Sequence, residues 1–588
     1  MSINANHPDL ATLLEGSRSS SHVTAFWQAI RPGHFAAVMG LVVLAVILRA
    51  ANMGATFESS DQAAMGHMIR HNYGIAWLFA YPYGPVLPIL HRAFAELLTL
   101  LHLPINETAT RVPTMWLSLA QVAITYPLLR RLSWPRVDSL VGTTCCAILP
   151  LLVTDAHYAW ADHAAWLLAG TVALWATLAY LDDRRIWQLA IAAAALLAHC
   201  LSSFHVLALP VTLMVVWMLA WRHPSRAMAG RSDRRAAIWA IGGGYVLPCI
   251  LALAVIIASW MWTGKGQLGH ILSKRNVGTF GLRFQQILEY PDMWFGQFGV
   301  VFGLIAAAGT VAGLVCLYQG KRIGLIAIWA WTAILPFVLL VNWNATGYAN
   351  YYMCETVYTA GLLGAWWLCT LFRSLPRWRS AWAILALCAF VQLTLGSVDV
   401  VIAGSGLQRY TGIFTGWGNV RPDSGVKAAG WYVREHVPME ATVLAIHTNK
   451  GMEISVAQYY TGRRVLAHYD IPRDLVAPLF KDTYTDADVV IVDVQYQSLV
   501  EAADTFELVC RLSHKGRPVR FVYARSKWAL PWVDEDVGII NTRYDACYQP
   551  RRVPLPLVAP DGFLDKLERY QTAKRRLKAN WLACQQQR

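Results

Sequence analysis

Two carboxylates stand in a short polar stretch directly after the first apolar run of the chain. The stretch reads FESSDQAAMGHMIRHNYG over residues 57–74. Glu58 and Asp61 lie three residues apart, so they share one face if the segment is helical. Carboxylates at a membrane boundary can act as general bases when they face a cavity. The same residues also fit an ordinary role, because SSDQ is a reasonable helix N-cap sequence.

A second polar set lies in TDAHYAWADHAAWLL, residues 154–168. Asp155 and Asp162 are seven residues apart and therefore share one face of a helix. His157, Tyr158 and His163 flank them, and carboxylates with imidazoles can bind polar substrates or a divalent metal. We expect a substrate-binding role with no resident metal or cofactor. A metal held by the two acids and two histidines is one alternative, and helix capping by either acid is another.

Three further polar groups stand near the ends of apolar runs. Histidines flank the turn LSSF, cations lie in the segment 263–296, and aromatic and amide residues lie in NWNATGYANYYMCE. Each could be an ordinary interfacial group, such as a lipid-contacting basic face or an aromatic belt. Their occurrence together with two acidic sets favours a cavity for an anionic ligand. The residues are His199 and His205; Lys265, Lys274, Arg275 and Arg283; and Asn342, Tyr348, Tyr351, Tyr352 and Glu355.

The elements that must position these groups are membrane spans. Of the 588 residues 56% are hydrophobic and 15% charged, whereas soluble proteins carry about 25% charged residues. The apolar residues gather into long blocks, which indicates a polytopic membrane protein. The first 34 residues are too polar for a secretory signal, so the first block is expected to be a retained span. Eleven spans are predicted, of which the fifth and sixth could instead form a helical hairpin or a re-entrant pair. They are 35–51, 112–129, 137–153, 163–181, 186–200, 205–221, 236–262, 297–318, 323–342, 354–372 and 381–402.

The charges of the connecting segments predict the orientation of these spans. If the N-terminus is cytoplasmic, every short cytoplasmic connection carries at least two Lys or Arg, and the short opposite connections carry none. Residues 52–111, 263–296 and those after 403 then lie on the outer side. The net charge of +14 follows largely from this orientation, so it gives little reason to expect nucleic-acid binding.

The outer segment 52–111 contains an apolar stretch of its own. YGPVLPILHRAFAELLTLLHL, from Tyr83, predicts a short helix that carries His91, Arg92 and Glu96 and is bounded by prolines. We expect this helix to lie along the membrane interface. A further span is the alternative, but it would invert the following loops and place the arginine-rich ones outside.

The composition changes near residue 403, after which a soluble domain is predicted. GVKAAGWYVREHVP and KGMEISVAQYYTG predict helices, and ATVLAIHT and DADVVIVDVQ predict strands. This alternation favours a small, mostly parallel sheet, without a glycine-rich phosphate loop. A disulfide between Cys510 and Cys547 is possible on an oxidising outer side. The predicted domains are a cytoplasmic segment 1–34, a transmembrane domain 35–402 and an extracytoplasmic α/β domain 403–588.

Together these motifs resemble the GT-C superfamily of integral-membrane glycosyltransferases, in particular the protein O-mannosyltransferase and lipid A aminoarabinose transferase branch. The resembling pieces are SSDQAAMGHMIRHNYG, YPYGPVLPILHRAFAELL, ETATRVPTMWLSLAQVAITYPLLRRL and the YAWAD that ends at Asp162. The resemblance implies a polytopic α-helical bundle of about eleven helices with an outer C-terminal α/β domain. One departure is Gln62, where many relatives have Glu, so Asp61 stands as the main acid.

The resemblance also implies an activity. A sugar would move from a polyprenyl-phosphate donor in the bilayer to a hydroxyl of a glycan, lipid or protein acceptor, in an inverting displacement that modifies the cell envelope. Asp61 would be the general base, and Asp162 would position the acceptor or orient a cation. Cations would stabilise the leaving lipid phosphate. The expected substrate-binding residues are Glu58, Arg111, Asp155, His157, Tyr158, His163, Lys265, Lys274, Arg275 and Arg283.

A bacterial inner membrane is the expected location, and two other classes of protein compete with a transferase. A transporter or flippase of a lipid-linked or polyanionic substrate would more often show internal repeats and binding groups at mid-membrane depth. A non-catalytic envelope-assembly protein would not depend on an acid in the first outer loop. Incorporation of labelled sugar, with and without Asp61, separates the three classes.

Overall fold

The structure is a computed structural model that describes residues 32–55, 63–66, 68, 75–159, 161–202, 208–222, 231–269, 284–340, 353–402, 425–446, 454–468, 473–538 and 559–587. By their mutual contacts the parts of the chain form two compact units. The bundle unit comprises Met1–Ala51, Gly74–Leu90 and Val112–Asn419. The sheet unit comprises Asn52–Tyr73, His91–Arg111 and Val420–Arg588. Parts of the predicted outer segment 52–111 thus group with the C-terminal domain and not with the predicted transmembrane domain.

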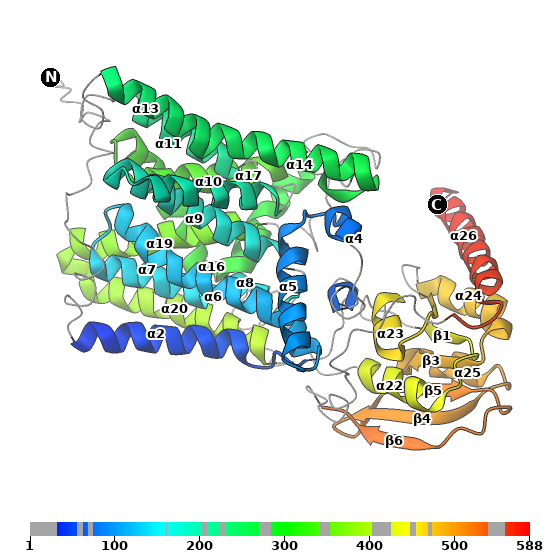
Figure 1. The fold of residues 1–588 in the computed structure, drawn as a ribbon. Helices are drawn as coiled ribbons and strands as arrows, with labels where there is room; N and C mark the ends of the chain where they lie inside the picture. Colours follow the sequence, from blue (N-terminus) through cyan, green and yellow to red (C-terminus); the bar gives the residue numbers. More distant parts are fainter. Residues whose placement is uncertain are drawn as a thin grey trace. The chain divides into compact units, whose positions relative to one another are not determined.

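Each of the eleven predicted apolar segments contains at least one helix, because long runs of apolar residues satisfy their backbone internally only as helices in lipid. Figure 1 shows α13, the short π-helix η2 (Gly242–Val246) and α14 as one continuous rod. The helices are α2 (Pro32–Ala50), α6 (Glu107–Arg131), α7 (Arg136–Ile148), α8 (Pro150–His157), α9 (Asp162–Asp183), α10 (Ile186–Cys200), α11 (Ala208–Arg222), α13 (Arg231–Ile241), α14 (Leu247–Thr263), α16 (Phe284–Tyr318), α17 (Gly324–Leu340), α19 (Cys354–Ser374) and α20 (Arg379–Val401).

The chain is an integral membrane protein by the length and composition of these helices. Five described segments can cross a membrane, and the bent pair α7 and α8 makes up to six if it is one span. Shorter apolar helices lie at Ala36–Ala50, Ile186–Cys200, Leu209–Met218 and Gly324–Ile334. For the described part of the chain the number of eleven spans therefore stays a prediction.

The bend between α7 and α8 has a local cause in the sequence. Leu149 adopts an extended conformation (φ −68°, ψ 119°), as expected for a residue that precedes a proline, and Pro150 begins α8. The two helices meet at an angle of 50°. The bend gives α8 its own direction, and all eight of its residues are buried.

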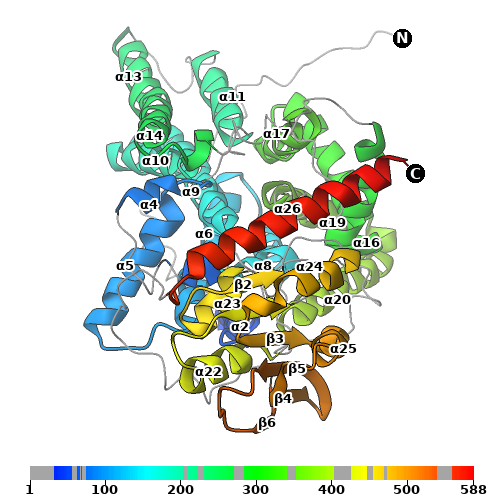
Figure 2. The same ribbon diagram turned by 90° about the vertical axis from the view of Figure 1, so that its right-hand side faces the viewer.

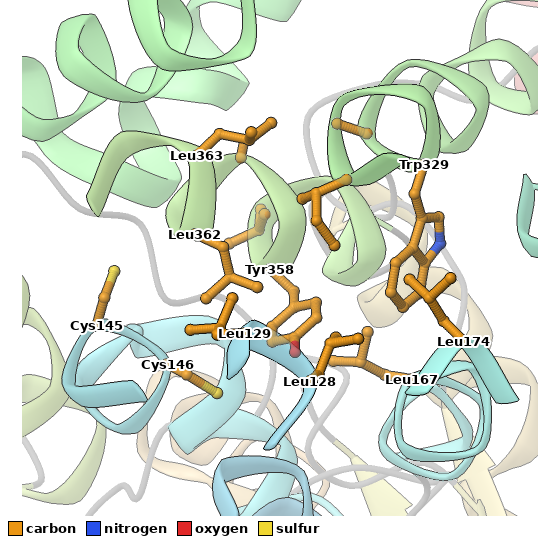
Figure 3. Packing of buried hydrophobic residues seen from close by; sticks show 14 of the residues in the cluster. Leu128, Leu129, Cys145, Cys146, Leu167, Leu174, Trp329, Tyr358, Leu362 and Leu363 are labelled. Carbon is orange, nitrogen blue, oxygen red and sulfur yellow. The ribbon is translucent and has the colours of Figure 1, made fainter. Parts of the chain in front are cut away.

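The core of the bundle unit is packed with leucine, alanine, cysteine and aromatic side chains. Figure 3 shows Tyr358 of α19 among Leu128, Leu129, Leu167 and Trp329. Its hydroxyl lies 3.0 Å from the Thr125 hydroxyl of α6, so this buried polar group has a partner.

The predicted interfacial helix corresponds to α5 (Val86–Leu100). Leu87, His91, Ala95 and Leu98 are buried along one face. Apolar side chains such as Leu97, 47% exposed, occupy another face. Its 15 residues span about 22 Å, less than the roughly 30 Å of a bilayer core. This pattern agrees with a helix that lies along the interface.

The sheet unit contains a six-stranded sheet in the order β2-β1-β3-β5-β4-β6. The β1–β2, β1–β3 and β4–β6 pairs are parallel, whereas β3–β5 and β4–β5 are antiparallel. The predicted mostly parallel sheet is therefore a mixed sheet, because a hairpin joins β4 to β5. The strands are β1 (Val443–Ile446), β2 (Leu466–His468), β3 (Val489–Asp493), β4 (Glu507–His514), β5 (Arg517–Ala524) and β6 (Val533–Asp536).

Helices cover both faces of this sheet (Figures 1 and 2). Alternate residues of each strand point to opposite faces, so Val443 and Ala445 join one core cluster and Leu444 and Ile446 join the other. The first cluster includes residues of α22 (Val426–His436) and α23 (Ile454–Thr461). The second includes residues of α24 (Val476–Thr483), α25 (Gln497–Glu501) and α26 (Phe563–Gln587). Cys510 is buried in β4, and Cys547 lies outside the described residues, so their disulfide stays a prediction.

Candidate functional site

The polar sequence TDAHYAWADH forms the connection between two helices of the bundle unit. Asp155 lies in the last turn of α8, and Asp162 and His163 lie in the first turn of α9. His163 Nε2 is in contact with Asp155 Oδ1, and His163 Nδ1 lies 3.9 Å from Asp162 Oδ1. The imidazole therefore stands between two carboxylates, and all three side chains are buried.

A buried arginine from the first span lies near these acids. Arg49 of α2 donates from Nε to Ser118 Oγ (2.8 Å) and from Nη1 to the Ala147 carbonyl (2.9 Å). Its guanidinium is close enough to Asp155 for their charges to interact. Sequence reasoning missed Arg49, although an ionisable residue inside an apolar block was the signal that could have identified it.

His157 and Tyr158 face other partners. His157 Nε2 lies 2.9 Å from the Leu48 carbonyl of α2. Tyr158 is buried in a small cluster with Ala161, Ala164 and Leu117. Within the described ranges no three His, Cys, Asp or Glu side chains are arranged to hold a metal ion. The described residues therefore give no support to the alternative of a metal ion bound by Asp155, Asp162, His157 and His163.

Two residues that the sequence placed in separate groups come together in the bundle unit. His199, at the end of α10, lies 3.7 Å from Glu355 in the first turn of α19, measured from Nε2 to Oε1. Its other ring nitrogen, Nδ1, lies 2.8 Å from the Trp166 carbonyl of α9. The Trp166 ring in turn contacts the His163 ring, with centroids 6.0 Å apart. We call Arg49, Asp155, Asp162, His163, His199 and Glu355 the acid–histidine cluster.

The cluster contains three carboxylates, two imidazoles and one guanidinium, all buried. Buried charges are costly unless they are paired, so such a group persists only as a mutually compensating set. Chemically it can hold a proton between an imidazole and a carboxylate and can fix the orientation of a cation. Ionisable residues within apolar helices are by default candidates for function.

Several predicted site residues lie outside the described residues. These are Glu58, Asp61, Lys274, Arg275 and Arg283, together with His205 and residues 342–352. Among the described ones, Lys265 is exposed just after α14. Arg111 is buried, and its Nη1 donates to the carbonyls of Met53 (2.7 Å) and Ala55. The described contacts of Arg111 therefore attach α6 to residues that precede the predicted base.

The sheet unit holds a second buried set that sequence reasoning missed. Lys427 of α22 and Tyr460 of α23 both contact the Glu107 carboxylate of α6. No local pattern signals this contact, because Glu107 and Lys427 are 320 residues apart. Asn106 precedes Glu107 and caps α6, accepting from the Ala109 N–H at 3.0 Å.

Comparison with known proteins gives a likeness of fold. No protein-family model matches the chain, and no curated protein matches it either. The crystal structure of the Archaeoglobus fulgidus oligosaccharyltransferase with zinc and sulfate matches with a TM-score of 0.51 at 14% identity, over 84% of this chain and 74% of the other. ArnT from Cupriavidus metallidurans bound to undecaprenyl phosphate gives 0.49 at 15% identity, over 85% and 98%. The protein O-mannosyltransferase Pmt1–Pmt2 complex of S. cerevisiae bound to the sugar donor gives 0.33 at 15%, over 43% and 35%.

Of these three likenesses, the first has a TM-score above 0.5, and the assignment of the fold rests on it. At 14% identity it establishes the fold and leaves the activity to be argued from the site. The chain therefore has the fold of this oligosaccharyltransferase, which agrees with the fold that the resemblance of its sequence to the GT-C superfamily implied.

Proposed function

We propose that the chain is a glycosyltransferase that moves a sugar from a polyprenyl-phosphate donor to an acceptor hydroxyl on the outer side of the membrane. The observation that carries this proposal is the acid–histidine cluster at the α8–α9 connection of a GT-C fold. Short connections with Lys or Arg alternate along the chain with short connections that have neither. By the positive-inside rule, this alternation predicts that the α8–α9 connection faces the outer side.

The reaction follows from the charges that it must move. The acceptor oxygen attacks the anomeric carbon while the bond from that carbon to the phosphate oxygen breaks, and the electron pair leaves with the phosphate. Asp61 takes the hydroxyl proton as the new bond forms. The leaving phosphate is stabilised by cations of the outer loops, Lys265, Lys274, Arg275 and Arg283, with Arg111 as a further candidate. Displacement from the opposite face inverts the anomeric configuration.

The burial of Asp162 favours an indirect role for this acid. Its side chain has no exposed surface and lies beside His163, which in turn contacts Asp155. Of the two roles that the resemblance implies, orienting a cationic or polar neighbour therefore suits Asp162 better than direct contact with the acceptor. Glu58, His157 and Tyr158 keep their expected place around the substrate as part of this proposal.

Transfer with a variant of the base tests the proposal. The purified chain in nanodiscs is incubated with a panel of undecaprenyl-phosphate-linked radiolabelled hexoses and pentoses and with total envelope lipids and glycans. We expect transfer by the wild type and at least a hundredfold loss in Asp61→Asn, since general-base catalysis contributes about 10²–10⁴-fold. Glu96→Gln, which changes an exposed acid of α5, is the matched control and should keep full activity.

The same preparation separates a transferase from a transporter. In proteoliposomes, movement of the lipid-linked sugar across the bilayer without a new glycosidic bond would identify a flippase and refute the transferase. Wild-type turnover in Asp61→Asn would remove Asp61 from the role of base. Unchanged anomeric configuration in the product would contradict the single displacement.

A further inference from the structure

The sheet unit joins three distant parts of the sequence into one compact body. Asn52–Tyr73 and His91–Arg111 come from the first outer loop, and Val420–Arg588 is the C-terminal domain. The first of these parts carries the predicted base, Asp61. The residues that hold the loop parts on the domain are therefore relevant to the proposed reaction.

A buried ion pair makes one of these connections. Lys427 Nζ of α22 lies 3.2 Å from Glu107 Oε1 and 3.4 Å from Oε2. The Tyr460 hydroxyl of α23 donates to Glu107 Oε1 at 2.9 Å. All three side chains are at most 1% exposed. Burying a carboxylate and an ammonium this far from water is costly unless they are paired, so the contact between Glu107 and Lys427 offsets part of the cost of burying each charge.

The close approach of α22 to α23 places both partners on the same carboxylate. Gly430 lies one turn after Lys427 and faces Tyr460. A Cβ built on Gly430 would lie 2.3 Å from Tyr460 Cβ, so the absence of a side chain is what lets the two helices lie this close. The contact is thus built into the packing of the domain.

Two further contacts attach the loop on either side of residues 56–62. Arg111, one helical turn after Glu107, donates to the carbonyls of Met53 and Ala55. Ala63 has no exposed surface and belongs to the core cluster that α22 and α23 form against the sheet. Glu107 and Arg111 stand on one face of α6. The ion pair of Glu107 with Lys427 therefore fixes the first turn of α6, and Arg111 at the end of that turn holds Met53 and Ala55.

We propose that Lys427 and Tyr460 are positioning residues for the transfer reaction. By fixing Glu107 they hold the first turn of α6, and through Arg111 they hold the residues that lead to Asp61. The C-terminal domain is then part of the catalytic apparatus, although it supplies no reacting group. This inference rests on the proposed function.

The test replaces Lys427 and reads catalysis, donor binding and loop mobility separately. In the full-length chain, Lys427→Met should lower kcat by about tenfold to a hundredfold, the range expected when a reacting group is misplaced by up to about 1 Å. The Kd for undecaprenyl phosphate should change by less than about twofold, because Lys265, Lys274, Arg275 and Arg283 lie elsewhere in the chain. The described hydrogen bonds of Arg111 go to the carbonyls of Met53 and Ala55. Hydrogen exchange of residues 52–55 and 63–66 should accelerate.

Two further variants separate positioning from stability. Arg463→Met removes a different buried cation of the same domain, one that donates to the carbonyls of Val433, Val437 and Pro438. It should lower Tm while leaving kcat of the folded protein and exchange of the loop near wild type. Glu107→Gln combined with Lys427→Met removes both charges, so it should recover Tm but keep the low kcat and the fast loop exchange.

The outcomes distinguish this inference from the proposed function. If kcat recovers together with Tm in the double variant, or if Arg463→Met lowers kcat as much at equal Tm, the pair only stabilises the domain and the inference is wrong. Unchanged loop exchange in Lys427→Met would also overturn it. If the wild type transfers no sugar while loop exchange responds as expected, the proposed function fails and the attachment of the loop stands.

Discussion

At the level of single residues, the bundle unit buries three carboxylates, two imidazoles and one guanidinium close together. Asp155, Asp162 and Glu355 would each be costly to bury alone. His163 contacts the first two, His199 lies beside the third, and Arg49 adds a permanent positive charge near Asp155. Mutual pairing explains how the set can exist in apolar helices, and it also fixes the orientation of each group. Such pre-organisation is what a site for a charged substrate requires.

In the sheet unit, Asp488 provides a test of pH dependence. Burial by itself raises the pKa of this carboxyl, but hydrogen bonds from Lys527 Nζ (2.5 Å) and the Thr442 N–H (3.0 Å) outweigh it and lower the pKa below its ordinary value. A lowered folded-state pKa stabilises the protein above the unfolded-state value of about 3.9, and this contribution is lost as the pH falls through the folded-state pKa. Asp488→Asn should therefore reduce the free energy of unfolding at pH 7, and this difference from the wild type should shrink as the pH falls below about 3.9.

The expected size of that effect is about 1 kcal/mol, since the Lys527 side chain is 57% exposed and water screens its charge. Denaturant unfolding of the full-length chain, followed by tryptophan fluorescence at several pH values, measures it. Asp561→Asn changes an exposed acid of the same unit and serves as the control. A difference between wild type and Asp488→Asn that does not shrink at any pH below about 3.9 would contradict the prediction.

At the level of elements, periodicity and composition predicted where helices form but not how they meet. The apolar blocks of the bundle and the amphipathic pattern of α22 are local properties, and each became a helix. The β4–β5 hairpin was missed because its signal is two residues, Lys515 and Gly516, both with positive φ (51° and 73°). The bend at Leu149 and Pro150 fell inside one predicted span. A single proline was too weak a signal to divide an otherwise apolar block.

The turn of this hairpin yields a prediction about its glycine. A Cβ at Gly516 would meet nothing within 4 Å, so a substitution there has a conformational cost and no steric clash with a neighbour. Gly516→Val should destabilise the chain by about 1–2 kcal/mol, because a β-branched residue resists positive φ. Gly516→Asn should cost less, since asparagine tolerates the left-handed region. Equal losses in the two variants, measured by denaturant unfolding, would show that φ at this turn is not what matters.

At the level of the whole molecule, the decisive contacts join residues that are far apart in the sequence. His199 and Glu355 belong to helices α10 and α19, and Glu107 and Lys427 are separated by 320 residues. The sequence singled out His199 and Glu355 in two separate polar groups, and it gave no sign of Glu107 or Lys427. Their pairing depends on which helices pack together, and no periodicity encodes that. The sequence grouped Asp155, Asp162 and His163 because they are close along the chain, and it missed the pairing of His199 with Glu355 because they are not.

The orientation of the chain is the property of the whole molecule that the sequence predicts most directly. The eleven predicted spans and the basic loops predicted to be cytoplasmic would place the two termini on opposite sides of the membrane. In spheroplasts, protease added outside should digest the C-terminal domain and leave an N-terminal tag intact, and inverted vesicles should show the reverse. A second tag in the loop 182–185 should be protected together with the first. Digestion of both termini from one side would mean an even number of spans, and a short apolar helix such as α10 or α11 would then fail to cross.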